Sequence, residues 1–333
     1  MVVVSGTKLA QEIGVSRFEV WRLVQQLRSL GAQIAGHPSS GYQLEAVPDL
    51  LLPDTLDPLI QGTMFAGRVQ HYFRVGSTNV LAMQEAQAGE PEGTVYFAEE
   101  QTAGHGRGGH DWHSVRSAGL YLSIVLRPPV APADALAISL MAGIATAAAV
   151  EQVTGIKADL RWPNDLLLPH PGIPAQGGAL QRKFCGILTE LNAEVTRVRF
   201  AVVGVGINVN QERFPAELAG IATSLRMESG REWSRVELAA ALLQSFDREY
   251  RRFMAPSAPA SAEPGGRTPS PRAALFRRFE EASSYARGRR VEVGEENSYT
   301  GTTAGLNAQG FLQVRTDDGS LRTVLSGGVR AID

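Results

Sequence analysis

The apolar residues of this chain follow two different spacings, and each spacing predicts a different kind of element. Helical spacing, with apolar positions three and four residues apart, occurs at 16–30, 77–88, 132–155, 235–254 and 273–286. Short alternating or continuous apolar runs, which are typical of strands, occur at 68–75, 93–98, 120–126, 159–168, 183–191 and 197–209. Helices and strands are therefore interleaved through the centre of the chain, without an internal repeat.

Residues 5–45 have the pattern of a winged helix-turn-helix. A turn at Gly14 separates two short helices, and Ser16 with Glu19 forms a capping box that begins the second one. Two short strands after Gly31 would form the wing. The residues of the second helix that we expect to face outward and contact DNA are Arg17, Phe18 and Arg22.

Two observations weigh against DNA binding by this module. The chain begins almost at the second helix of the motif, so we expect the leading helix of the usual three-helix core to be absent or very short. The four basic side chains of residues 5–45 are offset by three acidic ones, which leaves little charge for releasing counterions from DNA. A module that only packs against the rest of the protein therefore stays an alternative.

A glycine-rich stretch between two predicted strands, Glu99–Ser114, is a candidate for chemistry. It contains four glycines, three histidines, Arg107 and Trp112. Glycines allow successive backbone N–H groups to point at an anion, and arginine adds a permanent charge with a planar fork of donors. A flexible surface loop with chance glycines has the same composition, so this stretch alone does not assign a site.

Composition and charge exclude several classes of protein. The chain has 333 residues, enough for two or three domains, and its net charge of −2 argues against a surface coated with nucleic acid. The N-terminus lacks the features of a signal peptide, and no apolar run is expected to be long enough to span a bilayer. Cys185, the single cysteine, is expected to be a small buried residue rather than a catalytic thiol. These features predict a cytoplasmic protein without membrane contact.

The C-terminal half contains two loop-like segments and one small domain. Residues 169–181 form a hairpin loop rich in proline and glycine. Residues 255–272 contain five prolines, and we interpret them as a disordered insertion between two helices. Short strands with glycine turns from 288 to 333 predict a small SH3-like barrel.

Five motifs, in a single order along the chain, resemble those of the biotin–protein ligases. They are Ser77-Thr78-Asn79, Gln101-Thr102-Ala103-Gly104-x-Gly106-Arg107, Arg161-Trp162-Pro163-Asn164-Asp165, Lys183-Phe184-Cys185-Gly186-Ile187-Leu188-Thr189-Glu190 and Val203-Gly204-Val205-Gly206-Ile207-Asn208-Val209-Asn210. The resemblance covers the catalytic domain well. It extends less tightly to the two flanking domains of the bifunctional members, which are biotin–[acetyl-CoA-carboxylase] ligases and biotin-operon repressors.

The resemblance implies an α+β fold in three parts. A winged helix-turn-helix at 1–46 would be joined to a catalytic domain at 65–286 by a linker at 47–64, or a short irregular entry, which Pro48, Pro53 and Pro58 mark. That domain would resemble the class II aminoacyl-tRNA synthetases, with a mixed central sheet and the insertion at 255–272. An SH3-like domain would follow at 287–333.

The resemblance also implies a two-step reaction. The family first joins biotin and ATP into biotinyl-5′-adenylate, with release of pyrophosphate. It then transfers biotin to a specific lysine of the biotin carboxyl carrier protein of acetyl-CoA carboxylase. Because a carboxylate and a polyphosphate repel each other, the first step needs fixed positive charge where charge develops. We expect Arg107 to clamp the biotin carboxylate and the phosphate, and Lys183 to stabilise the α-phosphate. A surface ion pair and a solvated strand end are the respective alternatives.

The other site residues are assigned from the resemblance position by position. The residues expected to contact biotin are Ser77, Thr78, Asn79, Gln101, His105, Gly106, Arg107 and Lys183. The residues expected to contact ATP or the adenylate are Gly104, Trp112, Asn164, Asp165 and Asn208. Trp112 would stack on adenine, and Asp165 is the candidate ligand of Mg²⁺, which neutralises the leaving pyrophosphate. A helix N-cap at Ser77, a core anchor at Trp112 and a structural turn at Asp165 are the alternatives.

The glycine loop departs from the family pattern. The family usually has Gly-Arg-Gly-Arg-x-Gly-Arg, whereas residues 104–110 are Gly-His-Gly-Arg-Gly-Gly-His. His105 and His110 therefore replace two arginines, and Gly108 adds a further glycine. Histidine is mostly uncharged near neutral pH, so we expect the adenylate to be held less tightly and the activity to depend more strongly on pH.

Four functional readings follow from this pattern. The first is a ligase that also represses transcription by binding operator DNA, and the second is a ligase without DNA binding. The third is a lipoate–protein ligase of the same fold, which the glycine loop and the motifs around Asn164 and Lys183 disfavour. The fourth is a regulator without enzymatic activity. A homodimer is compatible with each of them.

Overall fold

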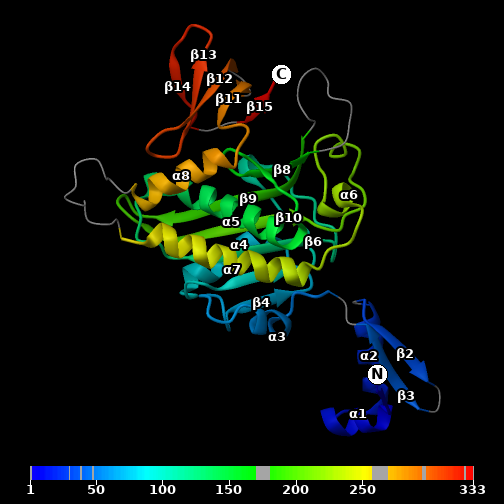
Figure 1. The fold of residues 1–333 in the computed structure, drawn as a ribbon. Coiled ribbons are helices and arrows are strands. Elements are labelled where there is room, and N and C mark those ends of the chain that lie inside the picture. Colours follow the sequence, from blue (N-terminus) through cyan, green and yellow to red (C-terminus); the bar gives the residue numbers. More distant parts are fainter. Residues whose placement is uncertain are drawn as a thin grey trace. The chain divides into compact units, whose positions relative to one another are not determined.

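The computed structural model describes residues 2–29, 31–37, 40–46, 49–169, 181–256, 269–294, 298–325 and 328–332. Contacts between residues divide the chain into two compact units, Met1–Leu50 and Leu51–Asp333. The expected order of parts is confirmed: a helix-turn-helix comes first, a mixed sheet with helices follows, and a small antiparallel sheet ends the chain (Figure 1).

The N-terminal unit consists of helices and a sheet of strand order β1-β3-β2. Its elements are β1 (Val3–Val4), α1 (Gly6–Ile13), α2 (Arg17–Ser29), β2 (Gln33–His37) and β3 (Gly41–Ala46). The Ser16 hydroxyl accepts a hydrogen bond from the Glu19 N–H at 3.1 Å, which is one half of the predicted capping box. The Glu19 carboxylate binds Arg22 instead, with Nε 3.0 Å away, so the charge of Arg22 is partly neutralised.

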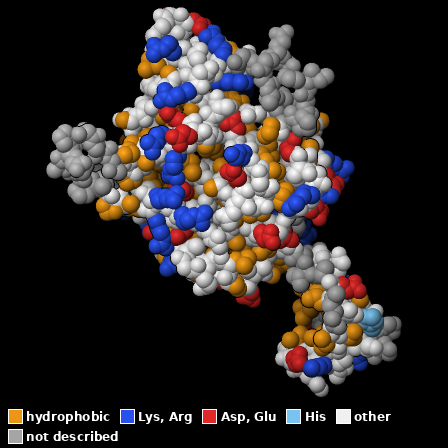
Figure 2. All heavy atoms as spheres, in the orientation of Figure 1, with side chains coloured by type: hydrophobic (Ala, Val, Ile, Leu, Met, Phe, Trp, Pro, Cys, Tyr) orange, Lys and Arg blue, Asp and Glu red, His pale blue; other side chains and the backbone are white. Residues whose placement is uncertain are grey.

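Helix α2 has apolar residues on two sides. Val20 and Val24 are buried with Ala10 in the core of the N-terminal unit. Phe18 and Trp21 are 71% and 50% exposed, and their rings stack with centroids 5.9 Å apart. Apolar atoms are accordingly visible on the surface of this unit (Figure 2). The helix expected to contact DNA therefore presents aromatic surface as well as charge.

A seven-stranded sheet of order β4-β5-β6-β10-β9-β8-β7 forms the centre of the second unit. Its strands are β4 (Val69–Tyr72), β5 (Val95–Ala98), β6 (Gly119–Leu126), β7 (Asp159–Arg161), β8 (Asp165–Pro169), β9 (Gln181–Ala193) and β10 (Val198–Asn208). The pair β4 and β5 is parallel and the other pairs are antiparallel, so the sheet is mixed, as expected.

Helices cover both faces of this sheet. The helices and 3₁₀ turns are α3 (Pro53–Leu56), η1 (Asp57–Leu59), α4 (Thr78–Ala88), η2 (Arg107–Gly109), η3 (Pro132–Asp134), α5 (Leu136–Thr154), α6 (Leu225–Ser229), α7 (Arg235–Met254) and α8 (Pro271–Glu281). Helices α5, α7 and α8 pack on one face and share the main core, whereas α4 packs on the other face over a smaller apolar cluster (Figure 1).

Helix α5 is apolar almost all round. Within the part of the chain that the structure describes, Pro132–Thr154 is long and apolar enough to cross a membrane by length and composition, contrary to the expectation that no run would be. A buried core helix passes the same test. Since 61% of its most apolar window is buried and it packs against α7 and the sheet, core burial accounts for its composition.

The segment expected to be a linker, 47–64, is mostly part of the catalytic core. Leu51 and Ile60 are fully buried in the same cluster as the central sheet, and the boundary between the two units falls before Leu51. Pro53 and Pro58 made this segment resemble a linker. Proline is also favoured in the first turn of a helix, and these two prolines lie in the first turns of α3 and η1.

The expected strand at 159–168 is a hairpin of β7 and β8. Trp162 lies in the turn between them, is 3% exposed, and is followed by a cis peptide bond to Pro163. Its indole N–H donates a hydrogen bond to the Gly310 carbonyl at 3.0 Å. The turn therefore connects the central sheet to the C-terminal part of the chain.

The C-terminal part is an antiparallel sheet of order β14-β13-β12-β11-β15. Its strands are β11 (Arg287–Val293), β12 (Tyr299–Leu306), β13 (Leu312–Thr316), β14 (Leu321–Thr323) and β15 (Val329–Ala331). Val291 and Val314 are fully buried in the main core, so this sheet folds onto the catalytic part. Most of the expected loop 169–181 and of the expected insertion 255–272 lies outside the described residues.

Candidate active site

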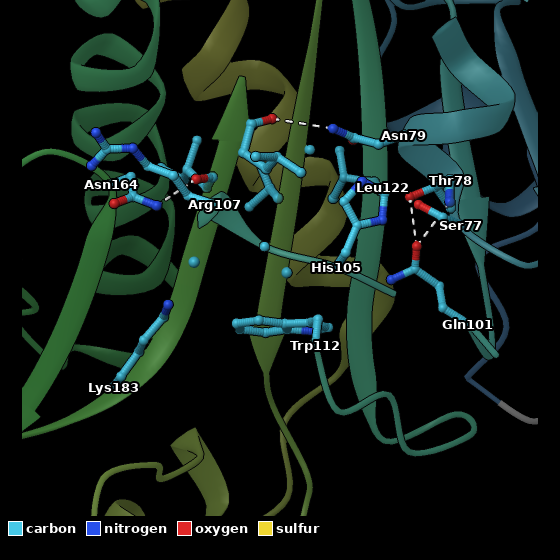
Figure 3. A pocket seen from close by; sticks show the side chains of 17 residues that line it. Ser77, Thr78, Asn79, Gln101, His105, Arg107, Trp112, Leu122, Asn164 and Lys183 are labelled. Atoms are coloured by element: carbon cyan, nitrogen blue, oxygen red, sulfur yellow. Dashed lines mark hydrogen bonds between the residues drawn. The ribbon is translucent and has the colours of Figure 1, made fainter. Parts of the chain in front are cut away.

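A pocket opens on the sheet face that carries α4, between the start of α4, the glycine loop and strands β9 and β10 (Figure 3). The expected site residues that line it are Ser77, Thr78, Asn79, Gln101, His105, Gly106, Arg107, Trp112, Asn164 and Lys183. Seven further residues, which we did not assign to the site from the sequence, also line it: Leu122, Gly186, Ile187, Leu188, Gly204, Val205 and Gly206. Side chains from separate motifs therefore surround a single pocket.

The first turn of α4 forms the polar end of the pocket. Ser77 occupies the N-cap position, but its side chain makes no cap hydrogen bond. The Gln101 Oε1 caps the helix instead, since it accepts bonds from the Thr78 N–H at 2.8 Å and the Thr78 hydroxyl at 3.1 Å. The side-chain cap that we considered for Ser77 is thus supplied by the glycine loop.

Asn79 is held in one orientation by three neighbours. Its Nδ2 donates to the Glu190 carboxylate at 2.9 Å and to the Leu188 carbonyl at 3.3 Å. Its Oδ1 accepts a bond of 2.5 Å from the Ser123 hydroxyl. Asn79, Ser123 and Glu190 form a polar network whose supporting members the sequence did not single out. Ser123 gave no signal because it lies within the apolar run of β6.

Glycines in β9 and β10 make room for side chains from other elements. A Cβ atom at Gly206 would lie 2.6 Å from Trp112 Cε2, and a Cβ at Gly186 would lie 2.9 Å from Trp112 Cζ3. A Cβ at Gly204 would lie 2.2 Å from Asn79 Oδ1. Gly204 and Gly206 pair in regular register with both neighbouring strands, so they mark close approach rather than a bulge.

Trp112 lies flat on this glycine surface at the centre of the pocket (Figure 3). Its indole N–H is buried and has no hydrogen-bond partner in the part of the chain that the structure describes. An unpaired buried donor costs about 1–3 kcal/mol, which a ligand acceptor would recover. The Lys183 Nζ lies 5.4 Å from the centroid of the indole ring. The ring therefore combines an aromatic face, a free donor and a nearby cation.

Two cations that face the pocket, Lys183 and Arg107, differ in their surroundings. Lys183 Nζ lies 2.7 Å from Asp165 Oδ1, and Arg161 Nη2 lies 2.5 Å from Asp165 Oδ2. Burial alone would raise the pKa of Asp165, but Lys183 and Arg161 lower the pKa below its ordinary value. Arg107 has no hydrogen-bond or ion-pair partner among the described residues, so its guanidinium is available to an anion.

Three expected nucleotide residues do not line the pocket. Gly104 is buried, and its carbonyl accepts the Trp112 N–H at 2.9 Å, which fixes the base of the loop. Asn208 is 4% exposed, and its Nδ2 donates to the Thr223 carbonyl at 3.1 Å. Asp165 does not line the pocket, and its two carboxylate oxygens form ion pairs with Lys183 and Arg161. The described residues contain no group of three or more His, Cys, Asp or Glu side chains that could hold a metal, and Asp165 does not fit as a Mg²⁺ ligand.

Residues that follow Trp112 and residues that follow β10 line a second cavity. Its lining includes His113, Phe214 and Gln211, and the first two rings lie with centroids 6.4 Å apart. The Gln211 Nε2 donates to Tyr121 Oη and to Asn208 Oδ1, at 3.1 Å and 3.2 Å. The Gln211 Oε1 is buried and has no hydrogen-bond partner among the residues that the structure describes, so an acceptor is left unpaired beside the second cavity.

Cys185 is fully buried on β9. Burial raises the pKa of its thiol far above the ordinary value, so a thiolate does not form at neutral pH. This agrees with the expectation of a structural rather than a catalytic cysteine.

His105 brings the loop close to β9. Its Nε2 lies 3.8 Å from Glu190 Oε2. His105→Arg places a permanent charge with a planar fork of donors beside the pocket, so we expect it to slow the dissociation of bound adenylate. His37→Arg in the wing of the N-terminal unit is the control. A dissociation rate unaffected by His105→Arg would contradict this account.

Comparison with known proteins assigns families to these parts. The profile of the Biotin/lipoate A/B protein ligase family matches residues 72–208, an HTH domain profile matches 2–43, and the biotin protein ligase C terminal domain matches 288–329. The bifunctional ligase/repressor BirA of Bacillus spizizenii is 34% identical over 253 residues, which are 75% of this chain and 74% of that protein. BirA of Escherichia coli is 28% identical over 98% of this chain and 92% of its own length.

A solved structure is similar as well. The biotin protein ligase of Aquifex aeolicus in complex with biotin and ATP superposes with a TM-score of 0.62 at 26% identity. The superposition covers 80% of this chain and 100% of that one.

Proposed function

The chain belongs to the biotin/lipoate A/B protein ligase family and is a biotin protein ligase, and on this premise we propose which of its residues activate biotin with ATP and which substrate receives the biotin. The observation that carries the proposal is the single pocket that gathers nine expected residues from four separate motifs, together with Trp112. A similar relative and a similar solved structure are named for biotin, which favours biotin over lipoate as the substrate.

We assign the polar end of the pocket to the ureido ring of biotin. A cyclic urea needs both donors and acceptors, and Ser77, Thr78 and Asn79 offer hydroxyl and amide groups there. The network of Ser123 and Glu190 fixes Asn79 before a ligand arrives, so little conformational entropy is lost on binding. Figure 3 shows this polar end on the side opposite Asn164 and Lys183. The biotin carboxylate would then extend towards the cations.

The first step joins two anionic groups. A carboxylate oxygen of biotin attacks the α-phosphorus of ATP, the bond to the bridging oxygen breaks, and pyrophosphate leaves. Arg107, whose guanidinium has no partner in the described structure, neutralises the carboxylate and the phosphate together. Lys183, held in place by Asp165, stabilises the charge that develops on the α-phosphate.

We place the adenosine on the side of Trp112. The indole offers a flat face and a free N–H, and the adjoining cavity adds His113, Phe214 and the acceptor of Gln211. Asn208 would act on this part of the site through its hydrogen bond to Gln211. Mg²⁺ would arrive with the ATP phosphates, which are its usual ligands together with water.

In the second step, the amine of the carrier lysine attacks the carbonyl carbon of the adenylate. AMP leaves, the amine loses a proton, and an amide bond forms. We propose the biotin carboxyl carrier protein of acetyl-CoA carboxylase as this partner and the cytoplasm as the location. Mycobacterium tuberculosis has a relative named biotin--[acetyl-CoA-carboxylase] ligase, 35% identical over 52% of this chain and 60% of its own length, which supports this assignment.

Exchange of labelled pyrophosphate into ATP tests the first step. We expect exchange that depends on biotin, is absent with lipoate, and falls by about 10²-fold or more in Arg107→Ala, because one charge stabilising the reacting anions is lost. Arg116→Ala is the matched control, since Arg116 is an exposed arginine that lies between the glycine-rich stretch and β6 and does not line the pocket. Exchange with lipoate only would assign the chain as a lipoate–protein ligase. Exchange with neither substrate would contradict the proposed function.

We also propose that the N-terminal unit binds operator DNA. The match to an HTH domain and the relatives named ligase/repressor support this role. The recognition helix is α2, where Arg17 and Phe18 are exposed in the first turn, the part of such helices that contacts bases. Arg22 contributes less because Glu19 already binds it.

A gel-shift titration with DNA upstream of biotin biosynthesis genes, at several salt concentrations, tests this role. Arg17→Ala should weaken binding and reduce the slope of log affinity against log salt by about 1. Arg22→Ala should change the slope less, because its guanidinium is paired. Equal effects of the two variants, or no shift at all, would favour the ligase without DNA binding.

A further inference from the structure

The Glu99 carboxylate lies completely buried just after β5, at the start of the glycine loop. Its Oε1 is hydrogen-bonded to the Leu51 N–H at 3.2 Å and to His71 Nε2 at 3.1 Å. Its Oε2 accepts bonds from the Ser117 hydroxyl at 3.0 Å and from Arg235 Nη1 at 2.7 Å. Four groups from four separate segments of the chain therefore meet on one carboxylate.

The carboxylate is ionised despite its burial. Burial alone would raise the pKa of Glu99, but the hydrogen bond from His71 and the charge and hydrogen bond of Arg235 lower the pKa to about 2. Buried ion pairs often stabilise a fold no more than apolar residues of the same size would. The burial of Glu99 is therefore weak evidence for added stability, whereas its four hydrogen-bond partners fix where the carboxylate lies.

These partners join the two ends of the glycine loop. The Ser117 N–H donates to the Glu99 carbonyl at 2.9 Å, in addition to the bond between the two side chains. Ser117 has a φ of +53°, and it alone among the non-glycine residues that the structure describes has a positive φ. Arg235 Nη1 also donates to the carbonyl of Gly119, the first residue of β6, at 3.2 Å. Glu99 thus fixes the points at which the loop leaves β5 and enters β6.

Pocket residues lie on the loop between these fixed ends. Gln101, two residues after Glu99, caps α4 and lines the pocket, and Arg107 and Trp112 follow. Glu99 itself does not line the pocket. A shift of its carboxylate would change where the loop begins and ends, and hence where these three side chains lie.

We infer that Glu99 is a positioning residue, which holds the glycine loop in the register needed to close over biotin and the adenylate. The inference rests on the proposed function of the pocket. It assigns to Glu99, with Ser117 and Arg235, control over how long the adenylate stays bound, rather than a part in the bond-making step.

The variant Glu99→Gln tests this inference, because glutamine has nearly the same shape but places an N–H₂ group where Ser117 and Arg235 now donate. We expect the KM for biotin and the dissociation rate of preformed biotinyl-adenylate to rise about tenfold or more, while kcat for pyrophosphate exchange falls less. Trypsin should also cut the variant faster within the loop, at Arg107 and Arg116, in the absence of any ligand.

Glu249→Gln is the matched control. Glu249 is 5% exposed, lies on the same helix as Arg235, and binds Arg252 and Arg278 at 2.8 Å and 2.7 Å, away from the loop. This variant should lower Tm in a comparable way but leave the adenylate dissociation rate, the KM for biotin and the loop cleavage unchanged. Equal changes in both variants, or unchanged dissociation and cleavage in Glu99→Gln, would overturn the inference.

Two further measurements keep the inference testable. If Glu99→Gln does not fold, Ser117→Ala removes a single bond to Glu99 and should still speed adenylate dissociation and loop cleavage. If the wild-type chain shows no biotin-dependent exchange, the proposed function fails. In that case, the rate of trypsin cleavage within the loop without ligand, compared between wild type and Glu99→Gln, still decides whether Glu99 positions the loop.

Discussion

Replacing Lys183 with alanine is expected to lower biotin-dependent pyrophosphate exchange by about 10²–10³-fold, the loss typical of removing one preorganised donor to a developing anion. Lys183 lines the pocket, and its ammonium is fixed 2.7 Å from Asp165, so it needs no reorganisation when charge forms on the α-phosphate. Because this stabilisation acts in the transition state, kcat and kcat/KM should fall together, and the KM for biotin should change little.

The control for Lys183→Ala must separate catalysis from folding. Removing Lys183 leaves Asp165 with Arg161 as its remaining partner, and a buried carboxylate that loses a cation destabilises the fold. Lys183→Ala combined with Asp165→Asn should therefore recover Tm without recovering exchange. Lys157→Ala, at an exposed lysine paired with Glu151, should leave both unchanged. Exchange by Lys183→Ala within threefold of wild type would rule out the assigned role.

Gly204→Ala is expected to raise the KM for biotin by roughly 10²-fold, as a misplacement of about 1 Å in a positioned site does. The new Cβ would lie 2.2 Å from Asn79 Oδ1 and 2.9 Å from its Cγ. Asn79 has no room to adapt in place, since Ser123, Leu188 and Glu190 hold its amide from the other sides. It must leave its position at the polar end of the pocket.

Steady-state kinetics and calorimetric titration with biotin would measure this loss. Gly220→Ala is the matched control, because a Cβ there meets no atom within 4 Å and the glycine has no positive φ. Gly204→Ala should bind biotin weakly and also lower Tm, since displacing Asn79 takes a partner from the buried Ser123 hydroxyl; the titration therefore compares the variants below their Tm. Unchanged biotin affinity in Gly204→Ala would show that Asn79 does not contact the ligand.

Local patterns were sufficient to predict most elements of this chain. The spacing of apolar residues placed α7 at Arg235–Met254 and the end of α4 at Ala88, because helix periodicity and glycine caps act over a few residues. Prolines misled the interpretation at Pro53 and Pro58, where the same residue type that marks a linker also begins a helix. A turn motif was likewise read inside one strand, whereas β7 and β8 form a hairpin.

The candidate site was predictable in its residue types more than in its geometry. The motifs identified nine of the ten expected residues that line the pocket, because each motif is a short run whose chemistry can be recognised by itself. Asp165 and Asn208 were expected at the nucleotide, but their places follow from neighbours distant in sequence, namely Lys183 and Thr223. Ser123 carried no signal, since a serine in an apolar strand resembles any other polar interruption.

By itself, the sequence determined the order of the domains, the family motifs and the glycine loop with its histidines, because these depend on residue identity and spacing. Only the tertiary structure decided which side chains share a pocket, which cations remain free, and which glycine accommodates which neighbour. Those outcomes depend on pairing between strands and on burial, which bring residues such as Asn79 and Gly204, or Glu99 and Arg235, together across long stretches of chain. Contacts of that kind leave no periodic signal in the residues between them.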